Sequence, residues 1–147
     1  NIILPGRFQV INKQPRVIID VAHNPHATEL LARNLNQYYP NQPVYAIFGV
    51  MADKDIAGMI TPLAKHVKQW YISTIDNTRS ANIETLKTIF ADKSLNKQYC
   101  RTISHAYQQA IDDLENHQVN NGIIIIFGSF YTVSEVLMFR EERINHE

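Results

Sequence analysis

The chain has little of what several common protein classes require. Only one of its 147 residues is a cysteine, Cys100, so no disulfide can form within the chain, and a reducing, cytoplasmic setting is the expectation. Its 14 basic and 14 acidic residues cancel, whereas a nucleic-acid-binding domain normally carries a basic surplus. The apolar run 123–127 is far too short to cross a bilayer. We therefore expect a cytoplasmic protein that binds neither nucleic acid nor a membrane.

Glycine is also scarce, with five residues in the chain. Neither Gly-x-x-x-x-Gly-Lys nor Gly-x-Gly-x-x-Gly occurs, so the chain has no recognisable phosphate-binding loop of its own. Any nucleotide that it meets would have to be held mostly by other groups. Ser129 is not part of a Gly-x-Ser-x-Gly motif, which argues against a nucleophilic serine at that position.

The pattern of apolar residues predicts an α/β fold in one domain, residues 1–147. Stretches with helical spacing separate short apolar runs at 17–21, 44–48, 70–73 and 123–127, with a weaker run at 98–103. Strands that alternate with helices indicate parallel βαβ units, and runs without polar alternation indicate strands covered on both faces. We expect a Rossmann-like, doubly wound, mostly parallel sheet of about six strands flanked by helices, to which residues 7–11 add an edge strand.

Several helix starts are marked by capping residues. Asn24 can cap a helix whose first residue is Pro25, where the missing N–H costs nothing. Pro62 interrupts the helical stretch 55–66 and predicts a kink or a new helix start there. Further starts are indicated by the capping-box pattern at 132–135 and by Ser104 and Asn82.

Polar residues follow four of the predicted strands at the point where each strand ends. In a parallel sheet with right-handed crossovers these ends lie along one edge. Asp20 lies at or near the end of the first run and His23 follows it, while 53–55 follow the second run, Arg79 the third and Ser129 the last. An unpaired carboxylate inside the sheet would cost several kcal/mol, so Asp20 is interpreted as an edge residue. These side chains are expected to meet at one site.

Each of these residues also has a purely structural interpretation. Asp20 could order a backbone turn, and Ser129 could do the same after Gly128. His23 could cap or pack, and 53–55 could be a solvated helix start. Asp20, His23 and His26 are spaced like metal ligands, but they cross a strand-to-helix corner and need not converge. We expect no metal site in this chain.

Four stretches together resemble one family, the C-terminal domain of bacterial bifunctional dihydrofolate synthase/folylpolyglutamate synthase, within the Mur ligase superfamily. The resemblance covers essentially the whole chain in order. It is carried by Leu4-Pro5-Gly6-Arg7-Phe8-Gln9, by Asp20-Val21-Ala22-His23-Asn24-Pro25-His26-Ala27, by the segment 49–55 ending in Ala52-Asp53-Lys54-Asp55, and by Gly128-Ser129-Phe130.

The resemblance implies an ATP-dependent amide ligase. In that family a folate or dihydropteroate carboxylate attacks the γ-phosphate of ATP, and the amine of L-glutamate displaces phosphate from the acyl phosphate. An N-terminal ATPase domain of the same polypeptide carries the P-loop, the Mg²⁺ ligands and the pterin site. Residues 1–8 are then the end of an interdomain linker. The parent is expected to be a monomer, and this domain alone is expected to be inactive and to bind neither ATP nor Mg²⁺ tightly.

The resemblance also assigns roles to individual residues. Arg7 and Asp20 correspond to contacts with ATP, and His23 and Ser129 to contacts with the incoming glutamate. Tyr131 departs from the pattern, since relatives often have histidine there, and no catalytic residue is assigned within this domain. Further residues are expected to line the site without a specified role: Asn24, Asp53, Lys54, Asp55 and Arg79.

Two alternatives remain at the level of sequence. One is the C-terminal domain of a cell-wall Mur ligase, although the opening motif and the 49–55 segment favour folate. The other is a stand-alone α/β module that binds a small ligand without ligase activity. The sequence does not decide whether the parent makes dihydrofolate, polyglutamates or both.

Overall fold

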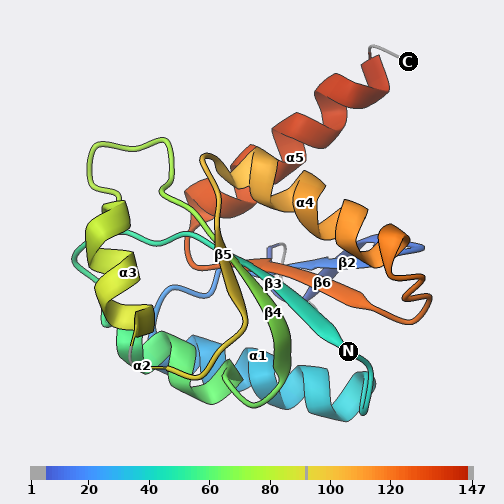
Figure 1. Ribbon diagram of the computed structural model, residues 1–147, viewed down its shortest axis with the longest axis horizontal. Coiled ribbons are helices and arrows are strands. Elements are labelled where there is room, and N and C mark those ends of the chain that lie inside the picture. Colours follow the sequence, from blue (N-terminus) through green and yellow to red (C-terminus); the bar gives the residue numbers. More distant parts are fainter. Residues whose placement is uncertain (1–5, 92, 146–147) are drawn as a thin grey trace.

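A computed structural model describes residues 6–91 and 93–145, so residues 1–5 of the expected linker lie outside the described part. Within that part, six strands form one sheet in the order β1-β2-β6-β3-β4-β5. β1 is antiparallel to β2, and the remaining neighbours are parallel. This confirms the doubly wound α/β prediction (Figure 1). The strands are β1 (Gln9–Lys13), β2 (Arg16–Ile19), β3 (Val44–Phe48), β4 (Val67–Ile72), β5 (Lys97–Tyr99) and β6 (Ile123–Phe127).

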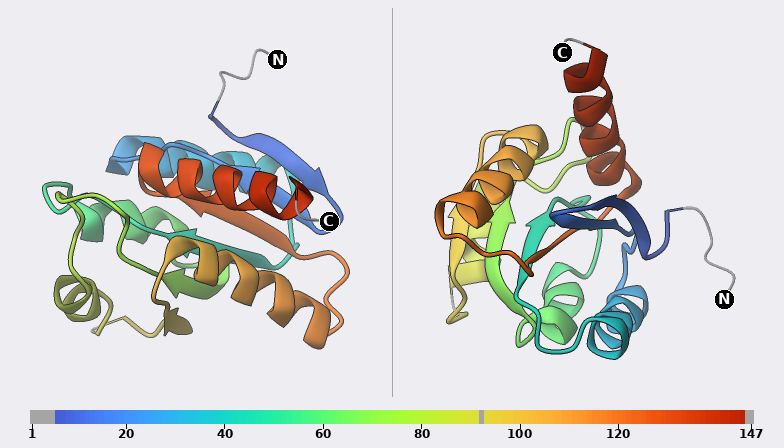
Figure 2. Two further views of the ribbon diagram at one scale, coloured as in Figure 1. Left: turned by 90° about the horizontal axis from the view of Figure 1, so that it is seen from above. Right: turned by 90° about the vertical axis from the view of Figure 1, so that its right-hand side faces the viewer.

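Helices cover both faces of the sheet, as the two views of Figure 2 show. The helices are α1 (Pro25–Tyr38), α2 (Ile56–Ile60), α3 (Ile83–Ala91), α4 (Ile103–Asn116) and α5 (Phe130–Asn145), with a 3₁₀ turn η1 (Thr61–Leu63) after α2. Side chains of α1, α2 and α3 share one core, and those of α4 and α5 share the other. No helix in the described ranges is long and apolar enough to span a membrane.

The central strands belong to both cores, which explains their uniform hydrophobicity. In β6, Ile123, Ile125 and Phe127 face the core under α1, whereas Ile124 and Ile126 face the core under α4. All five are at most 1% exposed. Because successive side chains of a strand point to opposite faces, a strand covered on both sides needs apolar residues at every position.

Some predicted boundaries were wrong by a few residues. β1 begins at Gln9, after the predicted start at residue 7, because Gly6 and Phe8 have positive φ angles of 79° and 44° and bend the chain there. β4 begins at Val67, before the predicted start at residue 70. β5 ends at Tyr99, and the rest of the 98–103 run leads into α4.

The helix starts were predicted with mixed success. Asn24 and Asn82 accept hydrogen bonds from the N–H groups of Ala27 and Thr85, both at 2.8 Å, as capping residues do. The restart at Pro62 is confirmed, since α2 ends and η1 begins there. The predicted cap at Ser104 was wrong, because α4 begins at Ile103 and its cap is Thr102.

Cys100, directly after β5, gives the fold a measurable pH dependence. Burial, with a smaller contribution from the Asp113 carboxylate, raises the pKa of its thiol from 9.0 to about 11. The folded chain therefore holds this proton more tightly than the unfolded chain, and the resulting stability is complete below pH 9 and is lost as the pH rises through 11.

We expect the wild-type chain to lose more unfolding free energy than Cys100→Ala between pH 9 and pH 11, by at most about 3 kcal/mol. Denaturant titrations of both proteins at several pH values measure this difference. Parallel pH profiles for the two proteins would contradict it.

Candidate functional site

The carboxyl ends of β2, β6 and β3 are joined by backbone hydrogen bonds that continue past the strands. These run from Asp20 N–H to Ile126 O (2.9 Å), from Gly128 N–H to Ala22 O (3.1 Å) and from Gly49 N–H to Phe127 O (3.5 Å). β2 leads to α1 on one face of the sheet and the adjacent β6 leads to α5 on the other. Ligands of doubly wound sheets bind at such a switch point. We call the loops 20–24, 49–55, 76–80 and 128–129 the rim.

Two glycines allow the rim loops to approach closely. Gly128 has a φ angle of 118°, and a Cβ atom there would lie 2.1 Å from the Gly49 carbonyl oxygen. At Gly49, a Cβ atom would lie 2.6 Å from a methyl group of Ile75. Both contacts are far below normal separations, so a Cβ atom at Gly128 would displace the backbone at Gly49, and one at Gly49 would displace the Ile75 side chain.

Asp20 lies at the rim, as predicted, and its carboxylate accepts hydrogen bonds from backbone N–H groups of the chain. It is 5% exposed. Oδ1 accepts a hydrogen bond from Ala22 N–H at 2.9 Å, and Oδ2 accepts one from Phe8 N–H at 3.1 Å. Burial raises the pKa of this carboxyl, and the two N–H groups and the Arg7 charge oppose the rise. The carboxylate thus orders two backbone segments, one of which carries Arg7.

His23 and Asn24 project from the loop between β2 and α1, and both are exposed. His23 Nδ1 lies 3.1 Å from Val21 O. A carbonyl oxygen only accepts, so Nδ1 carries the hydrogen in this contact and Nε2 is left for a ligand. His26 is exposed as well, and no group of three His, Cys, Asp or Glu in the described ranges could hold a metal ion.

Ser129 is buried, and its hydroxyl is engaged inside the fold. Thr132 O–H donates to Gly49 O at 2.8 Å, which uses its only proton. The contact between the two hydroxyls (2.9 Å) must therefore be donated by Ser129, whose Oγ also accepts from Thr132 N–H at 3.1 Å. Ser129 caps α5, so the predicted capping box at 132–135 was wrong. The positive φ of Gly128 turns the chain at once, and the helix starts two residues before Thr132.

The loops after β3 and β4 pair with each other and bring two cations to the rim. Ala52 N–H donates to Arg79 O at 2.8 Å, and Met51 and Ser80 form an isolated antiparallel bridge. Lys54 is half-buried and Arg79 is exposed. Two other predicted rim residues are exposed acids: Asp53, and Asp55, which caps α2.

Known proteins match the chain over most of its length. The family described as Mur ligase, glutamate ligase domain matches residues 6–130. The chain belongs to this family. The dihydrofolate synthase/folylpolyglutamate synthase of Buchnera aphidicola from Schizaphis graminum is 36% identical over 142 residues, 96% of this chain and 32% of that protein. The chain thus spans about a third of the length of this relative.

Solved structures agree with the sequence match. The Escherichia coli FolC complex with DHPP and ADP is 35% identical, with a TM-score of 0.83 over 95% of this chain and 32% of that one. A bifunctional folylpolyglutamate synthase/dihydrofolate synthase with Mn, AMPPNP and L-glutamate bound is also 35% identical, with a TM-score of 0.79 over 94% and 32% of the two chains. The resemblance stated from the sequence motifs is confirmed.

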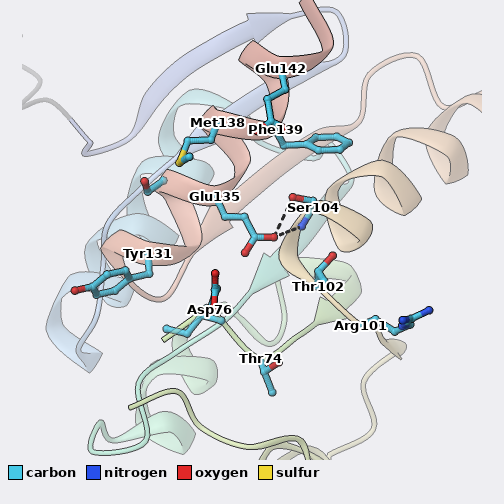
Figure 3. Close-up of a pocket in the computed structure, with 12 residues that line it drawn as sticks. Thr74, Asp76, Arg101, Thr102, Ser104, Tyr131, Glu135, Met138, Phe139 and Glu142 are labelled. Carbon is cyan, nitrogen blue, oxygen red and sulfur yellow. Dashed lines mark hydrogen bonds between the residues drawn. The ribbon is translucent and has the colours of Figure 1, made fainter. Parts of the chain in front are cut away.

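A cavity of about 580 Å³ in this Mur ligase domain lies beside the rim, between α4 and α5 (Figure 3). None of the residues predicted for the site lines it, and sequence reasoning missed it. Its charged groups are the carboxylates of Asp76, Glu135 and Glu142 and the guanidinium of Arg101. Three acids against one base disfavour an anion such as glutamate.

One carboxylate, that of Glu135, connects the two helices that line this cavity. Glu135 Oε2 accepts hydrogen bonds from Ser104 N–H at 2.7 Å and from Ser104 O–H at 2.9 Å. Ser104 lies inside the first turn of α4, where its N–H has no acceptor within the helix. Glu135 on α5 supplies that acceptor. Both residues looked like helix-start signals in the sequence, and nothing local indicated that they pair.

Proposed function

We propose that this chain is the glutamate-binding, ATP-facing domain of a ligase that adds L-glutamate to dihydropteroate, to folates or to both. The observation that carries the proposal is the convergence of the motif loops on one rim at the switch point of the sheet. The family match and the relatives solved with ADP, AMPPNP and L-glutamate support it.

The proposed reaction has two steps. An oxygen of the acceptor carboxylate attacks the γ-phosphorus of ATP and ADP leaves. The glutamate amine then attacks the acyl carbon, inorganic phosphate leaves and the amine gives up a proton. Phosphoryl transfer depends on positioning and charge neutralisation more than on a protein nucleophile. The rim would contribute cations and orientation to both steps.

Arg7 is the residue that we assign to the ATP phosphates. Its guanidinium is always charged and can form two parallel hydrogen bonds to phosphate oxygens. It lies next to Asp20, close enough for its charge to lower the pKa of that carboxyl. The chain has no phosphate-binding loop, so we expect the remaining contacts with ATP from the N-terminal ATPase domain of the same, monomeric polypeptide.

The glutamate substrate carries two carboxylates, and the paired loops after β3 and β4 carry two cations. We assign these carboxylates to Lys54 and Arg79, with Nε2 of His23 as a further contact. Ser129 takes part in this proposal mainly as the cap of α5, because its hydroxyl proton and one lone pair are used within the fold. Asn24, Asp53 and Asp55 then shape the loops around the substrate.

Magnesium would neutralise phosphate charge when bound. No group of three His, Cys, Asp or Glu side chains in the described residues could hold a metal ion. Mg²⁺ is bound through one or two carboxylates together with the phosphates, so we assign its ligands, as the family resemblance implies, to the domain that carries the P-loop. Phe130 and Tyr131 begin α5 beside Ser129 and are 66% and 40% exposed. Aromatic rings exposed at the rim fit a surface that another domain covers on closing.

The test compares the 147-residue chain with its full-length parent. We expect the parent to release ADP over many turnovers only when dihydropteroate or a folate and L-glutamate are both supplied with Mg·ATP, and the isolated chain to release none. A coupled ADP assay and mass spectrometry of the glutamylated product measure both. ADP release by the isolated chain, or a parent that ignores glutamate, would contradict the proposal.

A further inference from the structure

We propose that a second cavity, away from the rim, binds a small phosphate monoester through Arg140 and Arg143. The cavity has a volume of about 310 Å³ and lies between β1, α4 and α5. The two arginines belong to α5, and the apolar part of the lining comes from Ile111 and Ile144. Binding at this cavity does not require ligase activity.

The helix α5 carries this cavity away from the proposed ATP and glutamate contacts. It begins at Phe130, beside Ser129, and Arg140 lies ten residues further along. At a rise of about 1.5 Å per residue, the two positions are about 15 Å apart along the helix axis. In the part of the chain that the structure describes, no rim loop lines the cavity. A ligand there would therefore leave the groups of the rim free.

The charge of this cavity is opposite to that of the acidic cavity beside the rim. Within the described ranges its lining includes two arginines and no acid. The acidic cavity uses the same two helices, but α5 contributes Glu135 and Glu142 to it. Residues three apart are neighbours on a helix surface, so Arg140 and Arg143 leave α5 on the same side. Positive charge is thus concentrated at the smaller cavity.

The hydrogen bonds that the structure shows for the two guanidiniums, among the described residues, all go to uncharged groups. Arg140 donates to the hydroxyl oxygen of Tyr107 and to the carbonyl oxygen of Ile11, both at 3.0 Å. Arg143 donates to the side-chain oxygen of Gln108. Arg140 is half-buried, and a charge removed from water is costly unless an opposite charge compensates it. These bonds orient the planar groups and leave their charge for an anionic ligand.

Further donors remain at the same place. A guanidinium has five N–H groups, and the two bonds of Arg140 use two of them. Tyr107 is 7% exposed, and its oxygen is the acceptor in the bond from Arg140. The hydroxyl proton is not used in that bond, and because Tyr107 lines the cavity it can donate this proton to an anion.

The arrangement favours a phosphate group over a carboxylate. A phosphate monoester carries close to two negative charges above its second pKa of about 6, which matches two arginines. Its three terminal oxygens can accept from two guanidiniums and a phenol at once, whereas a carboxylate has two oxygens in one plane. The volume is at the lower end of ligand pockets, about 300–1,000 Å³, which indicates a small molecule.

The ester group has apolar side chains to contact. Ile111 is half-buried, and Ile144 is 68% exposed although it lines the cavity. A short hydrocarbon group on the ligand would remove part of this surface from water, and each buried methylene contributes about 0.8 kcal/mol, or about fourfold in affinity.

NMR titrations of the 147-residue chain with inorganic phosphate, butyl phosphate and succinate, at about pH 8, test the site. We expect saturable shifts at the side-chain Nε–H groups of Arg140 and Arg143 and at the amide of Tyr107. Butyl phosphate should bind more tightly than inorganic phosphate by about fourfold or more. Succinate should bind more weakly than inorganic phosphate. Shifts that do not saturate, saturable shifts elsewhere only, or succinate that binds as tightly as phosphate would overturn the proposal.

Arg143→Gln tests the charge without disturbing the bonds that Arg140 makes to β1 and α4. We expect it to weaken butyl phosphate binding by about tenfold or more, as for loss of a hydrogen bond to a charged group. Arg101→Gln is the matched control, because Arg101 lines the acidic cavity beside the same helices. At about 0.1 M salt, which screens distant charges, its affinity should stay within about twofold of wild type. Equal losses in the two variants would show a general charge effect and overturn the proposal.

Discussion

Gly128→Ala is expected to destabilise the domain by about 2–6 kcal/mol, from overpacking of about 1–3 and backbone strain of about 1–3. The new Cβ atom would lie 2.1 Å from the Gly49 carbonyl oxygen and 3.2 Å from the Phe48 ring, and the φ angle of 118° disfavours any side chain. The Gly49 oxygen belongs to the backbone and also accepts the Thr132 hydroxyl, so it cannot move alone. The predicted loss is comparable to the stability of an ordinary domain, about 5–15 kcal/mol.

Gly122→Ala is the matched control for this substitution. Its Cβ atom would also be crowded, at 2.5 Å from Leu114 Cδ2, but that atom ends a flexible side chain. Denaturant unfolding of both variants should therefore give a much larger loss for Gly128→Ala. Equal losses would show that the contact between the loops after β3 and β6 is not tight.

Arg7→Ala is expected to lower kcat/KM for ATP in the full-length parent by about 10²–10³-fold, as for removal of a preorganised group that stabilises transition-state charge. Arg7→Lys should recover part of the loss, because lysine keeps the charge but not the two-pronged geometry. Steady-state kinetics at saturating glutamate measure both.

Arg33→Ala is the control for loss of an arginine, because Arg33 is exposed on α1. Its kinetics should match wild type. Kinetics for Arg7→Ala that also match wild type would remove Arg7 from the nucleotide site and leave the rim without an assigned phosphate contact.

The sequence predicts the layered fold because burial on both faces leaves an unmistakable pattern. Ile123–Phe127 has no polar position, and a strand of this kind has to lie inside a covered sheet. Helix starts are harder to predict, because several nearby Ser and Thr residues compete as caps. Thr102, not Ser104, caps α4, and the N–H of Ser104 bonds to Glu135 on another helix. Ser129, not Thr132, caps α5, because Gly128 turns the chain immediately before it.

The sequence predicts which edge of the sheet carries the site, but it does not predict the hydrogen-bond partners of the site residues. Asp20, His23, Lys54, Arg79 and Ser129 all lie on rim loops, because the end of a parallel strand fixes the edge. Their partners come from elsewhere in the chain: Asp20 binds a group 12 residues away, and the Ser129–Thr132 pair reaches a carbonyl 83 residues away. No local pattern encodes such pairings, and the cavity between α4 and α5 was missed for the same reason.

The most direct measurement is an NMR titration of the 147-residue chain with Mg·ATP and with L-glutamate. Amide shifts concentrated at Arg7, His23, Lys54 and Arg79, and absent around Glu135 and Arg101 in the acidic cavity, are the result that we predict. Shifts confined to that cavity, or scattered over both helical layers while the rim stays silent, would contradict a ligand-binding rim at the carboxyl edge of the sheet.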